Sequence, residues 1–280
     1  MTPPASTAPE RRSPSFGVPR GSSPILAPSA VEDALRALFP SDWLADAPYE
    51  DQDLGMLKAG KESEVHLVAR TGPTRTCLMA EKRFKPRLQR AFRNDYLYAG
   101  VWGEGTRHED RAMKKRTRFG QEHLHARWIG HEWDTLVRLH AAGVTVPPPV
   151  ERTPGGYRMA FIGDGERAAP RLADVGLDVH TARRVWRELQ SEIRRMLEAD
   201  LVHGDLSAFN VLWWRSRPVI IDLSQAVDAI VHPAARELLR RDVERTAAYF
   251  RRLGVAIDPG AALAVVGDSD SRFARQVLSS

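Results

Sequence analysis

The sequence predicts an α+β fold in which strands dominate the first half of the folded region and helices the second. Apolar residues alternate with a period of two in segments 54–70 and 76–84, which indicates three strands. They recur at helical spacing in residues 185–197 and 238–253, which predicts two amphipathic helices. A chain of 280 residues, 42% of them hydrophobic, can bury the core of one large domain or two small ones.

The composition argues against a membrane protein. No apolar run approaches the roughly 20 residues that a membrane helix needs, and the N-terminus lacks the charged-then-apolar order of a secretory signal. The single cysteine, Cys77, cannot form an internal disulfide, and its position favours a small strand residue over a nucleophile. We therefore expect a cytoplasmic protein with no membrane partner.

The first 40 residues have the composition of a disordered tail. Regular structure is interrupted in residues 1–30 by seven prolines, which are Pro3, Pro4, Pro9, Pro14, Pro19, Pro24 and Pro28. A short amphipathic helix could form at Val31–Phe39. We expect the folded region to begin near residue 41.

The turn between the first two predicted strands, residues 59–63, could cover the phosphates of a nucleotide. Gly60 permits close backbone approach, and backbone N–H groups together with the Ser63 hydroxyl could contact phosphate oxygens, with Lys61 between them. One glycine is far from a glycine-rich loop, and an ordinary β-turn would explain the same residues. Both interpretations stay open at this point.

The strand at residues 76–84 places Lys82 on the same face as apolar neighbours. A surface lysine would more comfortably lie on the opposite face, so we expect Lys82 to meet a charge in a cleft. The candidate partner is Glu132, in a helix predicted from about residue 123 to 142 and ended by Gly143. The alternative is that both are ordinary surface charges.

Residues 201–214, LVHGDLSAFNVLWW, carry the most informative pattern in the chain. Asp205 and Asn210 lie five residues apart in a turn-rich segment, and Asp222 ends the next apolar run, which is the order found in kinase catalytic loops. Asn210 and Asp222 can supply the oxygen ligands that Mg²⁺ prefers. Asp205 can orient an attacking hydroxyl or water and accept its proton. Any one of these residues could simply cap a turn, but a purely structural role rarely demands the whole set together with His203.

The elements around this pattern can also be predicted. A helix capped by Thr181, with one apolar face, precedes the loop. Residues 211–214 and 218–221 predict two short strands that form a hairpin. Asn210 and Asp222 then lie at its open end, where antiparallel pairing would bring them close enough to share one metal ion.

With these residues in view, the chain resembles the RIO family of atypical protein kinases over roughly residues 54–255. The segments that carry the resemblance are AGKESEV, AEKRF, HEWDTLVRL, MAFIG, LVHGDLSAFNVL and IIDLSQAV. The last two are the most specific, because RIO members have Asp, an aliphatic residue, Ser and Gln where common protein kinases have Asp-Phe-Gly. Ala59 and Gly204 depart from the family, which usually has a hydroxyl-bearing residue and Ala there.

The resemblance implies a two-lobed protein-kinase-like fold, with a β-rich N-lobe at residues 41–161 and a reduced helical C-lobe at residues 162–280. The C-lobe would lack an activation segment and a substrate platform, in agreement with the 58 residues that follow Asp222. Because the region before the first predicted strand is short and rich in proline, we do not expect it to form the upstream winged-helix domain of one branch of the family.

ATP and Mg²⁺ are the cofactors that the resemblance implies. Backbone groups of Ala160 and Ile162, at the hinge between the lobes, would bind the adenine edge. Lys82, oriented by Glu132, would contact the α and β phosphates. The implied catalytic residues are Asp205, Lys82 and Asp222, with Asn210 and Asp222 on the metal.

A basic segment at residues 85–120 coincides with a long flexible loop of the family. Between Arg83 and Arg118 there are eleven basic residues against four acidic ones, although the whole chain has 41 and 36. Interleaved aromatic residues could stack on bases while the basic residues contact phosphates, so the segment could bind RNA. The resemblance suggests ribosomal RNA or a ribosomal subunit as partner, and a solvated mobile loop is the alternative.

Together these observations predict an ATP-dependent serine/threonine protein kinase of the RIO type, or an ATPase. The acceptor could be another protein, the chain itself through autophosphorylation, or water. One alternative is a small-molecule phosphotransferase of the aminoglycoside-kinase type, because HGDL followed by Asn also resembles that group. Another is a nucleotide-gated switch that controls association with RNA or the ribosome.

Overall fold

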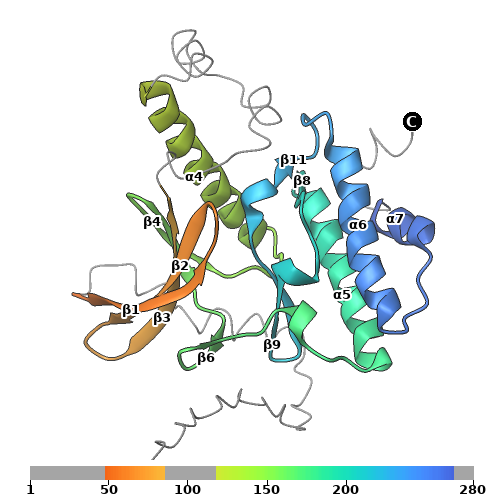
Figure 1. Ribbon diagram of the computed structural model, residues 1–280, viewed down its shortest axis with the longest axis horizontal. Coiled ribbons are helices and arrows are strands. Elements are labelled where there is room, and N and C mark those ends of the chain that lie inside the picture. Colours follow the sequence, from red (N-terminus) through yellow and green to blue (C-terminus); the bar gives the residue numbers. More distant parts are fainter. Residues whose placement is uncertain (1–47, 86–117, 268–280) are drawn as a thin grey trace, which may run out of the picture.

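A computed structural model of the chain describes residues 48–85 and 118–267. Figure 1 shows a sheet on one side and the helices α5, α6 and α7 on the other, which confirms the predicted α+β class. The predicted tail at residues 1–40 and most of the basic segment at 85–120 lie outside the described residues. Across the described ranges, no helix combines the length and apolar character needed to cross a membrane.

The N-terminal part is a five-stranded antiparallel sheet in the order β1-β2-β3-β5-β4. Its strands are β1 (Glu50–Ala59), β2 (Ser63–Thr71), β3 (Thr76–Phe84), β4 (Pro149–Thr153) and β5 (Gly156–Ala160). The predicted hairpin over residues 54–70 is confirmed, and β3 has the predicted bounds. Helix α4 (Arg118–Ala141) packs against β4 and β5. It begins before the predicted start and ends as predicted, with Gly143 at a φ of +74°.

The two faces of the sheet differ in chemistry. One face carries an ion-pair network centred on Arg70, which is 1% exposed and lies 2.7 Å from Asp51 and 2.6 Å from Glu151. Arg158 contacts the same two carboxylates at 2.5 and 2.8 Å. The other face is mainly apolar and includes Leu67, Ala80 and Phe161. We call this second face the apolar face, although Val68, Cys77 and Met79 also form a buried apolar cluster on the face of Arg70.

The C-terminal part is mainly helical. Its longer elements are α5 (Val179–Glu198), α6 (Ala235–Arg252) and α7 (Pro259–Gly267). Its short strands are β6 (Gly163–Asp164), β7 (Arg167–Ala168), β8 (Leu201–Val202), β9 (Val211–Trp214), β10 (Arg217–Ile220) and β11 (Val227–Asp228). Helices α5, α6 and α7 contact one another around a core that includes Leu189, Ile193, Val243 and Phe250. The helix predicted over residues 238–253 is confirmed as α6, whereas α7 was not predicted.

The predicted N-cap of α5 is wrong. Asp178, not Thr181, caps the helix, and its Oδ1 accepts hydrogen bonds from the N–H groups of His180 at 2.9 Å and Thr181 at 3.0 Å. The Thr181 hydroxyl in turn donates to Asp178 Oδ2 at 2.7 Å. A carboxylate placed before the first turn satisfies N–H groups that a threonine inside that turn cannot reach.

The predicted hairpin after the catalytic-loop segment is confirmed as β9 and β10. Val211 pairs with Ile220, and the strands are joined by Arg215 and Ser216 with φ of 47° and 62°. Positive φ at both central residues of a two-residue turn matches the twist of the strands it joins. The residues before β9 and after β10 are therefore brought to one end of the hairpin.

Candidate active site

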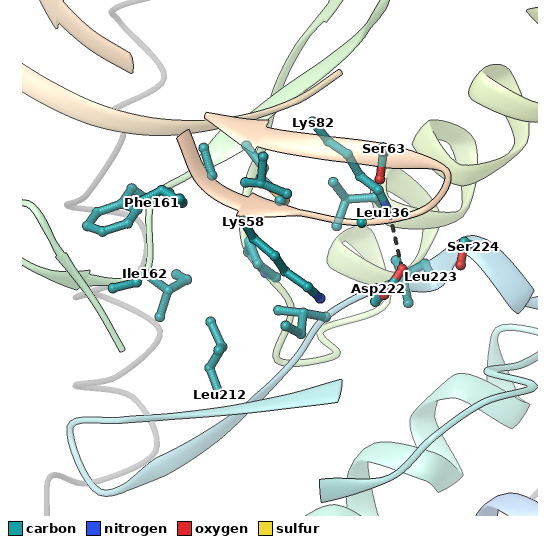
Figure 2. A pocket seen from close by; sticks show the side chains of 18 of the residues that line it. Lys58, Ser63, Lys82, Leu136, Phe161, Ile162, Leu212, Asp222, Leu223 and Ser224 are labelled. Carbon is teal, nitrogen blue, oxygen red and sulfur yellow. Dashed lines mark hydrogen bonds and ion pairs between the residues drawn. The ribbon is translucent and has the colours of Figure 1, made fainter. Parts of the chain in front are cut away.

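A cleft of about 500 Å³ lies between the apolar face of the sheet and the β9–β10 hairpin with the segment that follows it. Apolar residues from both sides line it, among them Val65, Ala80, Met159, Leu212 and Ile220. Six of the seven residues predicted to bind nucleotide line it as well: Gly60, Lys61, Ser63, Lys82, Ala160 and Ile162. Figure 2 shows Lys82 and Asp222 facing each other at one end, with Phe161 and Ile162 at the other. An apolar cleft with a few convergent polar groups is typical of a small-molecule site.

The β1–β2 turn at this cleft uses Gly60 for its own geometry. The Gly60 N–H donates to the Ser63 carbonyl at 2.8 Å, and a Cβ on Gly60 would lie 3.0 Å from the same oxygen. The N–H of Gly60 is thus already bonded within the turn. A phosphate contact from this turn, which stays a prediction, would have to come from Lys61, the Ser63 hydroxyl or other backbone groups.

The predicted pair of Lys82 and Glu132 is confirmed. Lys82 Nζ lies 2.5 Å from Glu132 Oε1 and 3.1 Å from Asp222 Oδ1. Glu132 is fully buried behind the lysine and does not line the cleft. The Tyr157 hydroxyl donates to the same Oε1 at 3.1 Å. The lysine is therefore held between one carboxylate behind it and another across the cleft.

The charges at this end of the cleft are fixed by the ion pairs. Burial would lower the pKa of Lys82, but the negative charge of Glu132 outweighs it and raises the pKa well above its usual range. The ammonium of Lys82 in turn lowers the pKa of Asp222 to about 2, although burial opposes the shift, and Lys58 contributes in the same direction. At neutral pH, Lys82 is an ammonium and Asp222 a carboxylate.

The predicted hinge begins at Ala160, the last residue of β5. The Ala160 N–H donates to the Pro148 carbonyl at 2.8 Å, and the Ile162 carbonyl accepts from the Ala169 N–H at 3.0 Å. Both residues line the cleft. The Ala160 carbonyl and the Ile162 N–H would be the groups that bind a base, and this role stays a prediction.

The segment after β8 is held from α6 by a buried carboxylate that sequence reasoning missed. Asp242 is 1% exposed; its Oδ2 accepts from the Gly204 N–H at 2.8 Å and its Oδ1 from the Leu206 N–H at 2.9 Å. Burial raises the pKa of Asp242 to about 7, although both N–H groups oppose the shift. Asp242 therefore fixes the backbone on both sides of Asp205.

The backbone geometry explains why position 204 is a glycine here, although the family usually has Ala there. Its φ is +78°, and a Cβ on it would overlap the Gln225 carbonyl oxygen. A residue with a side chain would be strained there and would displace the segment that follows Asp222. Glycine at position 204 therefore allows the segment around Asp205 and the segment after Asp222 to approach each other closely.

His203 connects the same two loops. It is 2% exposed, its Nε2 lies 3.2 Å from the Ile221 carbonyl, and its Nδ1 lies 3.3 Å from the Asp205 nitrogen. Burial lowers the pKa of His203, so the ring is neutral at neutral pH. A ring protonated at Nε2 satisfies both contacts, because Nε2 then donates and Nδ1 accepts. His203 thus positions Asp205 relative to the residue before Asp222.

The predicted base, Asp205, lies beside the cleft rather than in its wall. Its Oδ1 lies 2.7 Å from the Arg245 guanidinium of α6, and both side chains are about half exposed. The Asn210 amide nitrogen donates to the Asp205 carbonyl at 2.9 Å and lies 3.4 Å from its Oδ2. Asp205 is therefore oriented from two sides and open to solvent. Sequence reasoning gave no signal for Arg245.

The two predicted metal ligands lie at the open end of the hairpin, as expected. The Asn210 carbonyl accepts from the Ile221 N–H at 3.0 Å, next to Asp222. Since the Asn210 amide nitrogen is bonded to Asp205, its Oδ1 is the end left for a cation. Asp222 has a φ of 64°, a strained conformation for a residue with a side chain. One carboxylate and one amide oxygen suit Mg²⁺, which keeps waters and phosphate oxygens as its other ligands.

Comparison with known proteins identifies a family. A family model of the RIO domain matches residues 101–261, more than half of the chain. The chain is 40% identical over 132 residues to the RIO-type serine/threonine-protein kinase Rio1 of Haloferax volcanii, covering 47% of this chain and 44% of that protein. It is 37% identical over 131 residues to human serine/threonine-protein kinase RIO1, covering 46% and 23%.

The match to Rio1 of Thermoplasma acidophilum is 35% over 132 residues, which is 47% of this chain and 68% of that protein. For the proteins of Haloferax volcanii and Homo sapiens, the matched region spans less than half of the relative's own length. The family model nevertheless covers more than half of this chain. This chain belongs to the RIO family.

Proposed function

We propose that this protein is an ATP-dependent, Mg²⁺-using serine/threonine protein kinase of the RIO type, or an ATPase with the same site. The observation that carries the proposal is the position of Lys82 at one end of an apolar cleft, held between buried Glu132 and Asp222. Asp205 and Asn210 are held together beside that end. Phosphoryl transfer needs mainly positioning and charge, and these groups supply both.

Each residue has a distinct role in the proposal. The adenine would lie in the apolar cleft against the backbone of Ala160 and Ile162. Lys82 would contact the phosphates, while Glu132 keeps its ammonium in place. Mg²⁺ held by Asn210 and Asp222 would neutralise phosphate oxygens. Asp205 would orient the acceptor hydroxyl or water and take its proton.

For the phosphoryl acceptor and the binding partners, we propose classes of molecule rather than individual ones. The half-exposed side chain of Asp205 is open to a serine or threonine of another protein, to the chain itself in autophosphorylation, or to water. We propose that the basic segment at residues 85–120 binds RNA or a ribosomal subunit. Association with ribosomes would place the protein in the cytoplasm. Binding of ribosomal RNA by the whole chain, measured across salt concentrations, tests that partner.

The proposed chemistry is tested by phosphate release and autophosphorylation from ATP with and without Mg²⁺. Asp205→Ala should lower the rate about 10²- to 10⁴-fold, the usual contribution of a general base. Lys82→Ala and Asp222→Ala should also abolish most turnover, whereas Asp134→Ala, an exposed position on α4, serves as control. Full turnover in Asp205→Ala would show that the base is misassigned. Preferential phosphorylation of small hydroxyl compounds would favour a small-molecule phosphotransferase instead.

A further inference from the structure

A second lysine, Lys58, faces the cleft from β1. It is one of the residues that line the cleft, and Figure 2 shows its side chain extending from β1 toward the side where Asp222 lies. Its charge is one of those that act on the Asp222 carboxylate. Lys58 had no role in the predicted site, although Lys61, three residues later, did.

The strand register explains why Lys58 faces inward. Lys58 pairs with Val65 of β2, and Val65 pairs on its other side with Lys82 of β3. Directly paired residues on neighbouring strands project from the same face of a sheet. Lys58 and Lys82 therefore flank Val65 in one row on the cleft face.

A β-bulge produces this orientation. The pairing of β1 with β2 shifts between Met56 and Lys58, so that Leu57 is the extra residue. With regular alternation, Lys58 would project from the same face as Met56, which pairs with His66 on the opposite side of the sheet. Bulges commonly re-aim a side chain next to a functional site. The irregularity of β1 thus places an ammonium in the cleft.

The ammonium of Lys58 differs from that of Lys82 in having no carboxylate partner among the described residues. The charge of Lys82 is already matched by Glu132 and Asp222, two carboxylates against one lysine. Lys58 forms no ion pair with a carboxylate among residues 48–85 and 118–267. A polyphosphate carries several negative charges, which the Lys82 cluster alone does not balance. Lys58 supplies positive charge that no described ion pair uses.

We propose that Lys58 is a nucleotide-binding residue that contacts the phosphate groups alongside Lys82 and makes affinity depend on their number. The inference rests on the proposed function, because it assumes that the cleft binds a nucleotide. Lys58 acts on the terminal part of the ligand and contributes little to binding of the base. Its role is therefore separable from the hinge contacts of Ala160 and Ile162.

The test compares dissociation constants of ATP, ADP and adenosine for the wild type, Lys58→Met and Lys58→Arg by calorimetry. Lys58→Met should weaken ATP binding about 10-fold, the scale of one charge-assisted hydrogen bond, with a smaller effect on ADP and none on adenosine. Lys58→Arg should stay near wild type. The loss in Lys58→Met should shrink at high salt, because the site is open to solvent.

A matched control is Lys85→Met, which removes one positive charge outside the cleft, where Lys85 pairs with Glu64 at 3.1 Å. It should bind ATP like the wild type. Unchanged ATP affinity in Lys58→Met, or equal weakening of ATP and adenosine, would overturn the role of Lys58 while leaving the proposed function intact. A wild-type protein that binds none of the three ligands would overturn both.

Discussion

Asp242 gives the sharpest test of how the site is held together. Its carboxylate accepts two backbone hydrogen bonds, from Gly204 and Leu206, in a place that is 1% exposed. Asp242→Ala would leave both N–H groups buried without an acceptor, at about 1–3 kcal/mol each. The sum of about 2–6 kcal/mol is a large fraction of a typical stability of about 5–15 kcal/mol. This variant is therefore expected to unfold or to be strongly destabilised.

Asp242→Asn is the more informative change. It keeps one acceptor oxygen but turns an NH₂ group toward the other N–H, so we expect a loss of about 1–3 kcal/mol. Because these bonds fix the backbone on both sides of Asp205, the rate of ATP turnover should fall more than ATP affinity. Urea unfolding and steady-state kinetics measure the two effects. Wild-type stability and wild-type turnover in Asp242→Asn would refute the assigned role.

The pH dependence of the same variant tests the electrostatics. In the folded protein the pKa of Asp242 is about 7, above its ordinary value of 3.8. Between pH 3.8 and about pH 7, the carboxyl group therefore keeps its proton in the folded state and has lost it in the unfolded state. Wild-type stability relative to Asp242→Asn should therefore fall as pH rises through this window, by up to about 1.4 kcal/mol per pH unit. Between pH 5 and 7 this amounts to about 2 kcal/mol, because the slope flattens near the folded pKa. A difference that is constant from pH 5 to 8, or that grows with pH, would refute a raised pKa.

Two further predictions concern ion pairs of contrasting burial. Glu132→Gln removes the buried carboxylate behind Lys82, and breaking such a pair should cost about 3–5 kcal/mol in urea unfolding and weaken ATP binding; unchanged stability would contradict the pairing. Arg245→Ala should change stability by less than about 1 kcal/mol, because its pair with Asp205 is half exposed. The same variant should lower the turnover rate about 10-fold or more through misplacement of Asp205, with part restored in Arg245→Lys. Equal turnover in Arg245→Ala and wild type would show that the contact has no positioning role.

Local pattern was sufficient for the elements that carry their own periodicity. The alternation in residues 54–70 and 76–84 predicted β1 to β3, and the apolar run before Asp222 predicted the β9–β10 hairpin. An apolar strand with one inward lysine predicted the Lys82–Glu132 pair, since a buried charge needs a partner. The local sequence pattern did not predict the capping residue of α5, because several polar residues near the start of this helix could cap it.

Asp242 could have been found from sequence but was not interpreted. It follows Leu239 by three residues and precedes Thr246 by four, so it lies on the buried face of α6. A carboxylate on such a face needs donors. Which donors it meets depends on the packing of α6 against the segment after β8, and α6 alone does not reveal that packing.

The sequence by itself determined which residue types could perform phosphoryl transfer and on which strands, turns and helices they lie, because hydrophobic period and turn residues act over a few positions. Only the tertiary structure decided how Asp205 is paired with Arg245, 40 residues later, and why burial raises the pKa of Asp242. It also decided which way Lys58 points, since one extra residue in β1 reverses the face of the side chains after it. Contacts between distant segments, and the electrostatic environment they create, exist only when the chain is packed.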